Sequence, residues 1–449
     1  MPKQTVLSLA AELAAGRTTS RALTEAALAR IADPAGEGKR TFTKVYRDEA
    51  LAAADAQDTL RQAGYVTSPL SGLPVSVKDL FDVAGEVTLA GSIALDDRPP
   101  ATEDAPIVAR LRAAGAVIVG KTNMTEFAFS GVGYNPHYGT PGNPFDRSLI
   151  PGGSSAGAPV SVVDEQAVVA IGTDTGGSVR VPAALCGVVG FKPTQFRVSR
   201  DGAIPLSTTL DSIGPLANSV ACCAITDAVI AGEAPEAPEP VPANLLRLAV
   251  PKTFFFEKVA PEVASAFDNA RAVLERAGAR IVDLPLSELN EYPAMMAKGG
   301  FSAVEAFAWH KDIIARRGNE YDRRVRERIE RFGGLSAVEY IEHGHARAGL
   351  IARVDRQTAQ FDAFLAPTVA ITAPPLAAFE RDEDYWRLNS LILRNTAIIN
   401  FLDRCALSLP IQKPGSAPVG LMIVGAHGAD RDLLAVGRGI EAALAEAAR

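Results

Sequence analysis

Residues 151–194 read PGGSSAGAPVSVVDEQAVVAIGTDTGGSVRVPAALCGVVGFKPT and combine dense glycine, serine and threonine with short apolar runs. Two serine-bearing turns lie in this stretch, GGSS at 152–155 and DTGGS at 174–178. Each turn adjoins an apolar segment, so we expect both turns at the ends of packed elements. Glycine at such density lets the backbone approach a reacting atom closely. The pattern therefore indicates a site in which one of these serines attacks a carbonyl.

Other interpretations of the same glycines remain open at this point. Most glycine-serine turns serve only as turns. A phosphate-binding loop is disfavoured, because the pattern G-x-x-x-x-G-K-[ST] is absent and no lysine follows either turn in register. The pattern G-x-S-x-G, which marks the nucleophile turn of α/β-hydrolases, is also absent. Spacing alone leaves a catalytic serine and a structural turn as the alternatives.

An attacking serine needs a neighbouring base, because its hydroxyl is a weak nucleophile until its proton is removed. Histidine is the usual base, but all five histidines lie outside the glycine-rich stretch: His137, His310, His343, His345 and His427. Lys78 closes an alternating apolar run, residues 73–78, that we interpret as a strand. Burial there would lower the pKa of Lys78 toward the range in which it can accept a proton. The alternative is a solvated lysine at the end of the strand.

Several blocks of the sequence together resemble the amidase signature family. They are VSVKD at 75–79, GGSS at 152–155, GTDTGGSVRVPAA at 172–184 and GVVGFKPT at 187–194. The resemblance extends over nearly the whole chain and is strongest over residues 73–215. It implies an α/β fold: a single large domain with a central mixed, twisted β-sheet that helices cover on both faces.

The resemblance implies a Ser-cisSer-Lys triad. Ser178 would be the nucleophile that forms an acyl-enzyme. Ser154 would follow a cis peptide bond from Gly153 and would relay the proton of Ser178 to Lys78, the terminal base. The two serines lie 24 residues apart, a separation that also fits the family. No metal and no organic cofactor would be required for this chemistry.

Further residues of the same blocks would complete the catalytic site. The resemblance implies an oxyanion hole made by four consecutive backbone N–H groups, those of Thr175, Gly176, Gly177 and Ser178. Three other residues would support the site: Ser155, Asp174 and Arg180. For Arg180 we favour an ion pair with Asp174 over a direct catalytic role.

The loop at 128–134 corresponds to the segment that lines the acyl pocket in relatives. We expect four of its residues at the substrate: Ala128, Phe129, Ser130 and Val132. Phe129 and Val132 would make the pocket apolar, and Ser130 would offer one polar contact. Phe301, Phe307 and Trp309 could add aromatic walls, although packing in the core is the favoured interpretation for them.

The chain is expected to form one amidase signature domain over residues 1–449. Apolar periodicity and capping residues predict helices at 7–15, 20–31 and 47–63, which would form an N-terminal layer within 1–65. Strands that alternate with helices predict a catalytic core over 70–215, with the signature stretch at 151–194. Residues 216–385 resemble relatives least and would cover the mouth of the site and select the substrate. Residues 386–449 would complete the sheet.

Composition excludes several classes of function. The chain has 449 residues, 47% of them hydrophobic, which is enough to bury a large core. A net charge of −7 gives no basic surface for nucleic acid. No apolar run approaches the length of a membrane span, and no signal sequence is evident. The four sparse cysteines indicate reduced thiols, so we expect a soluble cytoplasmic protein that binds neither membrane nor nucleic acid.

The resemblance to the amidase signature family implies an enzyme that hydrolyses a small-molecule amide of a carboxylic acid, or a urea-derived amide, to an acid and ammonia or an amine. Two alternatives stay open. One is a protein like the A-type component of tRNA-dependent amidotransferases, which would pass ammonia from glutamine to a partner protein. The other is a non-catalytic relative that binds an amide. The chain could also form a homodimer.

Overall fold

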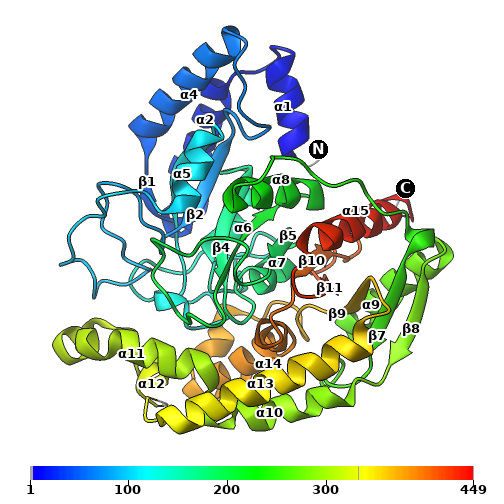
Figure 1. The fold of residues 1–449 in the computed structure, drawn as a ribbon. Coiled ribbons are helices and arrows are strands. Elements are labelled where there is room, and N and C mark those ends of the chain that lie inside the picture. Colours follow the sequence, from blue (N-terminus) through cyan, green and yellow to red (C-terminus); the bar gives the residue numbers. More distant parts are fainter. Residues whose placement is uncertain (1–3, 332, 448–449) are drawn as a thin grey trace.

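The computed structural model describes residues 4–331 and 333–447. One mixed sheet runs through the molecule, and its strands come from the N-terminal and the C-terminal parts of the chain (Figure 1). Its strands, in spatial order, are β1 (Phe42–Val45), β3 (Val117–Thr122), β2 (Pro74–Lys78), β4 (Val169–Asp174), β6 (Ser212–Ala217), β5 (Val189–Lys192), β10 (Ala406–Pro410), β11 (Gly420–Val424), β9 (Ala363–Pro367), β7 (Arg247–Pro251) and β8 (Arg280–Leu284).

The pairing directions divide this sheet into three parts. Strand β2 runs parallel to both β3 and β4, and β7 runs parallel to both β8 and β9. The strands between these two groups pair antiparallel. Lys78 and Asp174 are the last residues of the parallel neighbours β2 and β4. They therefore lie at the same end of the sheet, where ligands of α/β proteins usually bind.

Fifteen α-helices surround the sheet among the described residues. They are α1 (Val6–Ala14), α2 (Ser20–Ala32), α3 (Gly38–Thr41), α4 (Arg47–Gln62), α5 (Pro106–Ala113), α6 (Gly157–Val163), α7 (Arg180–Cys186), α8 (Val220–Ala231), α9 (Pro261–Arg276), α10 (Tyr292–Met295), α11 (Gly300–Arg317), α12 (Arg323–Arg331), α13 (Ala337–Thr358), α14 (Asp382–Phe401) and α15 (Asp430–Ala447). Short 3₁₀ turns connect some of them, among them η1 (Glu126–Ala128).

Strand β4 shows how the sequence divides between the two faces of the sheet. Val169 and Ile171 belong to the large core cluster that also holds residues of α5, α8 and α15. Ala170 lies between them in sequence and packs instead with residues of α6 and α7. Successive side chains of a strand point to opposite faces, so an uninterrupted apolar run fits a strand that helices cover on both sides. This arrangement confirms the predicted α/β fold.

The predicted helices and strands agree closely with the structure. The three N-terminal helices are α1, α2 and α4, and Thr19 Oγ1 caps α2 by accepting from the N–H of Ala22 at 3.0 Å. Strand β2 has the predicted residues 74–78. Strand β3 was expected to end at Gly120 but continues to Thr122, because Lys121 and Thr122 still pair with Val77 and Lys78 of β2.

Helices α11, α12 and α13 and the long helix α14 lie together below the sheet in Figure 1, on the side where β2 and β4 end. Most of this layer comes from the segment 216–385 that was expected to cover the site. The four cysteines are buried as free thiols. Among the described residues, no helix combines the length and the apolar character needed to cross a bilayer.

Candidate active site

Lys78 is fully buried at the end of β2. Its Nζ donates hydrogen bonds to Ser154 Oγ and to Thr173 Oγ1, both at 2.8 Å. Burial lowers the pKa of Lys78 to about 7, although the nearby carboxylates of Asp211 and Asp174 oppose the shift. The side chain can therefore be uncharged near neutral pH and can accept a proton. The interpretation of Lys78 as a solvated strand end is wrong.

The turn that carries Ser154 is fixed against the rest of the site through its backbone. The Gly153–Ser154 peptide bond is cis, as the resemblance implied. The carbonyl oxygen of Ser154 accepts from the N–H of Thr125 at 3.0 Å, and the N–H of Ser155 donates to the carbonyl oxygen of Ser178 at 3.3 Å. The Ser155 hydroxyl donates to the carbonyl oxygen of Thr173 at 3.4 Å. The two serine turns that lie apart in the sequence thus meet in the fold.

Asp174 organises the second serine turn. Its carboxylate accepts from Nε and Nη2 of Arg180 at 3.0 and 2.9 Å, and both side chains are fully buried. It also accepts from Asn400 Nδ2 at 2.9 Å. Burial alone would raise the pKa of Asp174, but Arg180 and these hydrogen bonds hold it well below its usual range. The expected ion pair is confirmed, and it locks the beginning of helix α7 to the end of β4.

The N–H groups of the turn 175–178 do not all point in one direction. The N–H of Gly177 donates to Asp174 Oδ1 at 2.8 Å. Among the described residues, no protein group accepts from the N–H groups of Thr175, Gly176 and Ser178. Gly177 was expected among four oxyanion donors, but its N–H is already engaged by the carboxylate; for Thr175, Gly176 and Ser178 the role stays a prediction.

Two further contacts hold this turn from the side of β6. Thr175 Oγ1 donates to Asp211 Oδ1 at 2.5 Å, and Ser212 Oγ donates to the carbonyl oxygen of Asp174 at 2.9 Å. Burial raises the pKa of Asp211 to about 6, while hydrogen bonds from Thr175 and the backbone oppose the rise. Asp211 and Ser212 therefore support the site.

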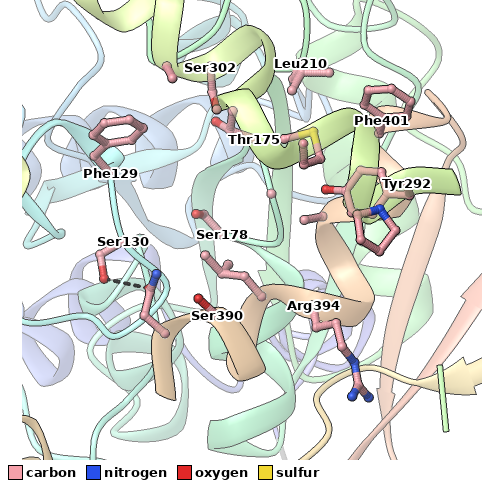
Figure 2. Close-up of a pocket in the computed structure, with 18 of the residues that line it drawn as sticks. Phe129, Ser130, Thr175, Ser178, Leu210, Tyr292, Ser302, Ser390, Arg394 and Phe401 are labelled. Carbon is pink, nitrogen blue, oxygen red and sulfur yellow. Dashed lines mark hydrogen bonds between the residues drawn. The ribbon is translucent and has the colours of Figure 1, made fainter. Parts of the chain in front are cut away.

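Ser178 lies in the wall of a cavity of about 530 Å³. Figure 2 shows Phe129 and Ser130 on one side of Ser178 and Tyr292 and Phe401 on the other. Thr175 and Gly176 also line the cavity. Lys78 and Ser154 are completely buried behind this wall. A substrate in the cavity can reach Ser178, while the lysine is shielded from bulk water.

The cavity lining corrects part of the predicted acyl pocket. Ala128, Phe129 and Ser130 line the cavity, as expected. Val132 does not, because it is fully buried in an apolar cluster with Ile150 and Val181. The hydroxyl of Ser130 accepts from Tyr385 Oη at 2.7 Å and donates to Asn389 Oδ1 at 3.0 Å. Phe301, Phe307 and Trp309 pack in or against the core clusters, as favoured above.

Several residues of the site were not predicted. Thr173, the second partner of Lys78, directly precedes Asp174 in an otherwise apolar strand, and this isolated hydroxyl is the signal that could have found it. Asn400, Tyr292 and Phe401 come from distant segments without a recognisable motif.

The amino-acid sequence is similar to that of known proteins over most of its length. A sequence model of the family described as Amidase matches residues 22–434. The chain is 39% identical to 2-amino-5-chloromuconic acid deaminase of Comamonas testosteroni, over 88% of this chain and 87% of that protein. It is 37% identical to the A-type component of glutamyl-tRNA(Gln) amidotransferase from Chloroflexus aurantiacus, over 96% of this chain and 95% of that protein.

Solved structures agree with these similarities. A crystal structure of an amidase superposes with a TM-score of 0.89 at 34% identity, and covers 98% of this chain and 99% of that chain. The native peptide amidase from Stenotrophomonas maltophilia superposes with a TM-score of 0.80 at 30% identity, over 98% of this chain and 97% of that chain. With the family matched over most of its length, the chain belongs to the amidase signature family, whose members act on carbon–nitrogen bonds.

Proposed function

We propose that the protein hydrolyses a small-molecule linear amide to a carboxylic acid and ammonia or an amine, with Ser178 as the nucleophile. The observation that carries this proposal is the buried Lys78–Ser154 hydrogen bond of 2.8 Å behind the cavity wall to which Ser178 belongs. A lysine with a pKa near 7 can take up the proton that an attacking hydroxyl must lose.

The proposed reaction proceeds through an acyl-enzyme. Ser178 Oγ attacks the amide carbon while its proton passes to Ser154, and the Ser154 proton passes to the neutral amine of Lys78. The carbon–nitrogen bond then breaks, and the leaving nitrogen takes up the proton that returns along the same path. Water attacks the resulting ester with the relay again removing a proton, and the carboxylic acid leaves.

The proposed oxyanion site uses the N–H groups of the turn after β4. The donors of Thr175, Gly176 and Ser178 have no acceptor among the described residues, and all three residues line the cavity. The turn is held in place by Asp174, and each such donor is typically worth about 2.7–4 kcal/mol in the barrier. Preorganised donors of this kind stabilise the developing charge without further rearrangement.

Substitution of Ser178 tests the proposal directly. Ser178→Ala is expected to lower kcat by a factor of about 10⁴ or more for every accepted amide, because the acyl-enzyme cannot form. Ammonia release from a panel of aliphatic, aryl and urea-derived amides provides the assay. Ser199→Ala serves as the control, since this half-buried serine forms side-chain hydrogen bonds with Asp201 alone among the described residues and does not line the cavity. A variant S178A that retains wild-type turnover would refute the assignment.

The similarity to the A-type component of glutamyl-tRNA(Gln) amidotransferase favours a second candidate function. In that case the same acyl-enzyme chemistry would release ammonia from glutamine for a partner protein. Co-purification of the chain with a large partner, together with glutaminase activity that requires this partner, would support the second function. Full amidase activity of the isolated chain supports the first.

The relative from Comamonas testosteroni adds a direction for the substrate search. Its name identifies an acid that bears an amino group as the compound on which that protein acts. We therefore include amides of acids that bear an amino group in the substrate panel, because Ser178 can form an acyl-enzyme only where an acyl–nitrogen bond breaks. Release of ammonia from them by wild type but not by S178A would extend the proposed function to this class.

A further inference from the structure

Two consecutive residues of the loop that lines the cavity have a strained backbone. Phe127 and Ala128, in the 3₁₀ turn η1, have φ angles of +51° and +61°. Residues other than glycine adopt this left-handed region rarely, and such strain persists only where surrounding contacts enforce it. Ala128 and the next two residues, Phe129 and Ser130, line the cavity beside Ser178. The contacts that enforce the strain therefore also set the position of this cavity wall.

Glu126, the residue before the strained pair, is a fully buried carboxylate that the proposed hydrolysis does not use. Its Oε1 accepts from Ser92 Oγ at 2.6 Å and from His137 Nε2 at 2.9 Å. Its Oε2 accepts from the backbone N–H of Asp322 at 2.7 Å. A carboxylate removed from water needs such donors. The three donors come from separate segments of the chain, so Glu126 binds all three segments to the turn.

The bond to Asp322 connects the turn to helix α12. Asp322 Oδ1 accepts from the N–H of Arg324 at 2.7 Å, so the same residue caps the helix. Further along α12, Arg328 Nη1 donates to the carbonyl oxygen of Phe129 at 2.8 Å, and Arg328 also lines the cavity. The segment 126–129 is therefore attached to α12 at two points, with the strained residues between them.

Aromatic packing holds the side chain of Phe127 but does not replace Glu126. The Phe127 ring centroid lies 4.4 Å from that of His310 and 4.9 Å from that of Tyr321. These rings offer no acceptor to the backbone N–H of Asp322, for which Glu126 is the one acceptor among the described residues. Loss of the Glu126 carboxylate would therefore release the turn from α12 at one of its two points of attachment.

The catalytic turn is attached to the same loop through backbone atoms alone. The N–H of Thr125 donates to the carbonyl oxygen of Ser154 at 3.0 Å. This bond does not involve the Glu126 side chain. Loss of the Glu126 carboxylate should therefore displace the cavity wall and leave the Lys78–Ser154 pair in place.

We propose that Glu126 is a positioning residue that holds the cavity wall at 128–130 in the form that binds the substrate. This inference rests on the proposed amide hydrolysis and adds a determinant of substrate affinity to it. A ligand that extends from Ser178 along this wall depends on Glu126, while a ligand confined to the reacting group does not.

Sulfonyl fluorides of different size test this inference, because they react with a nucleophilic serine whatever the natural substrate is. The Ser178 oxygen forms a bond to sulfur, fluoride leaves, and the serine proton passes to the relay. Methanesulfonyl fluoride is compared with two larger reagents, butane-1-sulfonyl fluoride and phenylmethanesulfonyl fluoride. Mass spectrometry locates the adduct. The inhibition constant KI and the rate constant kinact follow from adduct formation at increasing reagent concentration.

Three variants separate positioning from fold stability. E126M removes all acceptors and should raise KI for at least one larger reagent about 10- to 100-fold, with kinact and the methanesulfonyl fluoride reaction within about threefold of wild type. E126Q keeps one oxygen for the Asp322 N–H and should give an intermediate KI. E37M is the control, because Glu37 is also a buried carboxylate but binds Arg40 and the N–H of Gly142 instead of the loop. It should lower the melting temperature and leave KI unchanged.

Several results would overturn the inference. They are wild-type KI values for both larger reagents in a folded E126M, an equal rise of KI in E37M, or an equal loss with all three reagents, which would place the damage at the nucleophile. If E126M does not fold, E126Q and S92A decide by the same criteria.

The inference and the proposed function fail in different ways. Absence of Ser178-dependent amide hydrolysis would refute the proposed function. Where wild type forms no Ser178 adduct, calorimetric binding of 3-phenylpropionamide to S178A and to S178A/E126M decides the inference. Weaker binding to the double variant supports it. Equal binding to both proteins, or binding to neither, refutes it.

Discussion

Two buried ionisable residues give the site its chemistry at the scale of single residues. Lys78 loses hydration at the end of β2 and has no carboxylate in direct contact among the described residues, so its neutral form is favoured. Asp174 is equally buried but keeps its charge, because Arg180 and Asn400 bind it directly. The same burial therefore favours a neutral amine in one position and a fixed anion in the other.

The shifted pKa of Lys78 predicts the pH dependence of catalysis. Because this pKa is lowered to about 7, the neutral amine is lost as the pH falls through that value. We expect kcat/KM to rise between about pH 6 and 8 and to level off above. The residual activity of Lys78→Ala should lack this acidic limb. A wild-type profile that is flat from pH 5.5 to 8.5, measured by ammonia release, would contradict the assignment of Lys78 as the base.

The Asp174–Arg180 pair predicts a loss of stability when one partner is removed. Asp174→Asn leaves the fully buried guanidinium of Arg180 without its counter-charge. Such changes typically cost about 3–5 kcal/mol, which urea unfolding can measure. Glu383→Gln, in the exposed pair with Arg381, is the control and should change the unfolding midpoint little. Equal unfolding midpoints for D174N and E383Q would show that the buried pair does not stabilise the fold.

At the scale of elements, the turn between β4 and α7 depends on its two glycines in different ways. Gly177 has a φ of +132°, and a Cβ there would lie 2.1 Å from Thr396 Oγ1 of α14. A Cβ at Gly176 would meet only Ala397 Cβ, at an ordinary 3.7 Å. Thr396 Oγ1 also donates to the carbonyl oxygen of Gly176 at 2.7 Å. Helix α14 therefore packs directly against the turn that carries Ser178.

This packing predicts that two neighbouring alanine substitutions differ in their effect on thermal stability. Gly177→Ala should destabilise the protein by about 1–3 kcal/mol or more and reduce activity, because both its φ and the space are unsuitable for a side chain. Gly176→Ala should retain the wild-type melting temperature. Thermal unfolding and amide turnover of both variants provide the comparison. Equal melting temperatures for G176A and G177A would contradict the described geometry of the turn.

Most helices and strands that carry the site could be predicted from the sequence, because their apolar patterns and capping residues are local signals. Strand β2 has an alternating apolar run that ends in Lys78, and α2 follows a capping threonine, Thr19. Val132 was assigned wrongly, because an apolar residue next to Ser130 suits a pocket and a core equally well. The Gly177 N–H was assigned wrongly too, since no sequence pattern reveals that a nearby carboxylate engages it.

At the scale of the whole molecule, one apolar core joins segments from both ends of the chain. Core residues from Val6 in α1 to Ile440 in α15 belong to one apolar cluster, and the sheet runs without interruption between β1 and β8. Figure 1 shows the two termini on the same side of the molecule. Residues such as Arg328 and Asn400 reach the site only through this tertiary arrangement, and the local sequence around them could not predict it.

The continuous core predicts cooperative unfolding. We expect a single thermal transition in calorimetry, with coincident curves from far-ultraviolet circular dichroism and tryptophan fluorescence, because strands from both halves of the sheet contribute to one large core cluster. Two resolved transitions would contradict this view. They would indicate that β7, β8 and β9 melt independently of the strands that carry Lys78 and Asp174.

Identification of the residue that forms the covalent intermediate tests the central claim most directly. The protein is treated with a fluorophosphonate, digested, and analysed by mass spectrometry, with S178A as the control. We predict one stoichiometric adduct on Ser178, loss of amide turnover in proportion to labelling, and no adduct in S178A. Full labelling at another residue, or complete turnover with Ser178 blocked, would contradict the assignment of Ser178 as the nucleophile.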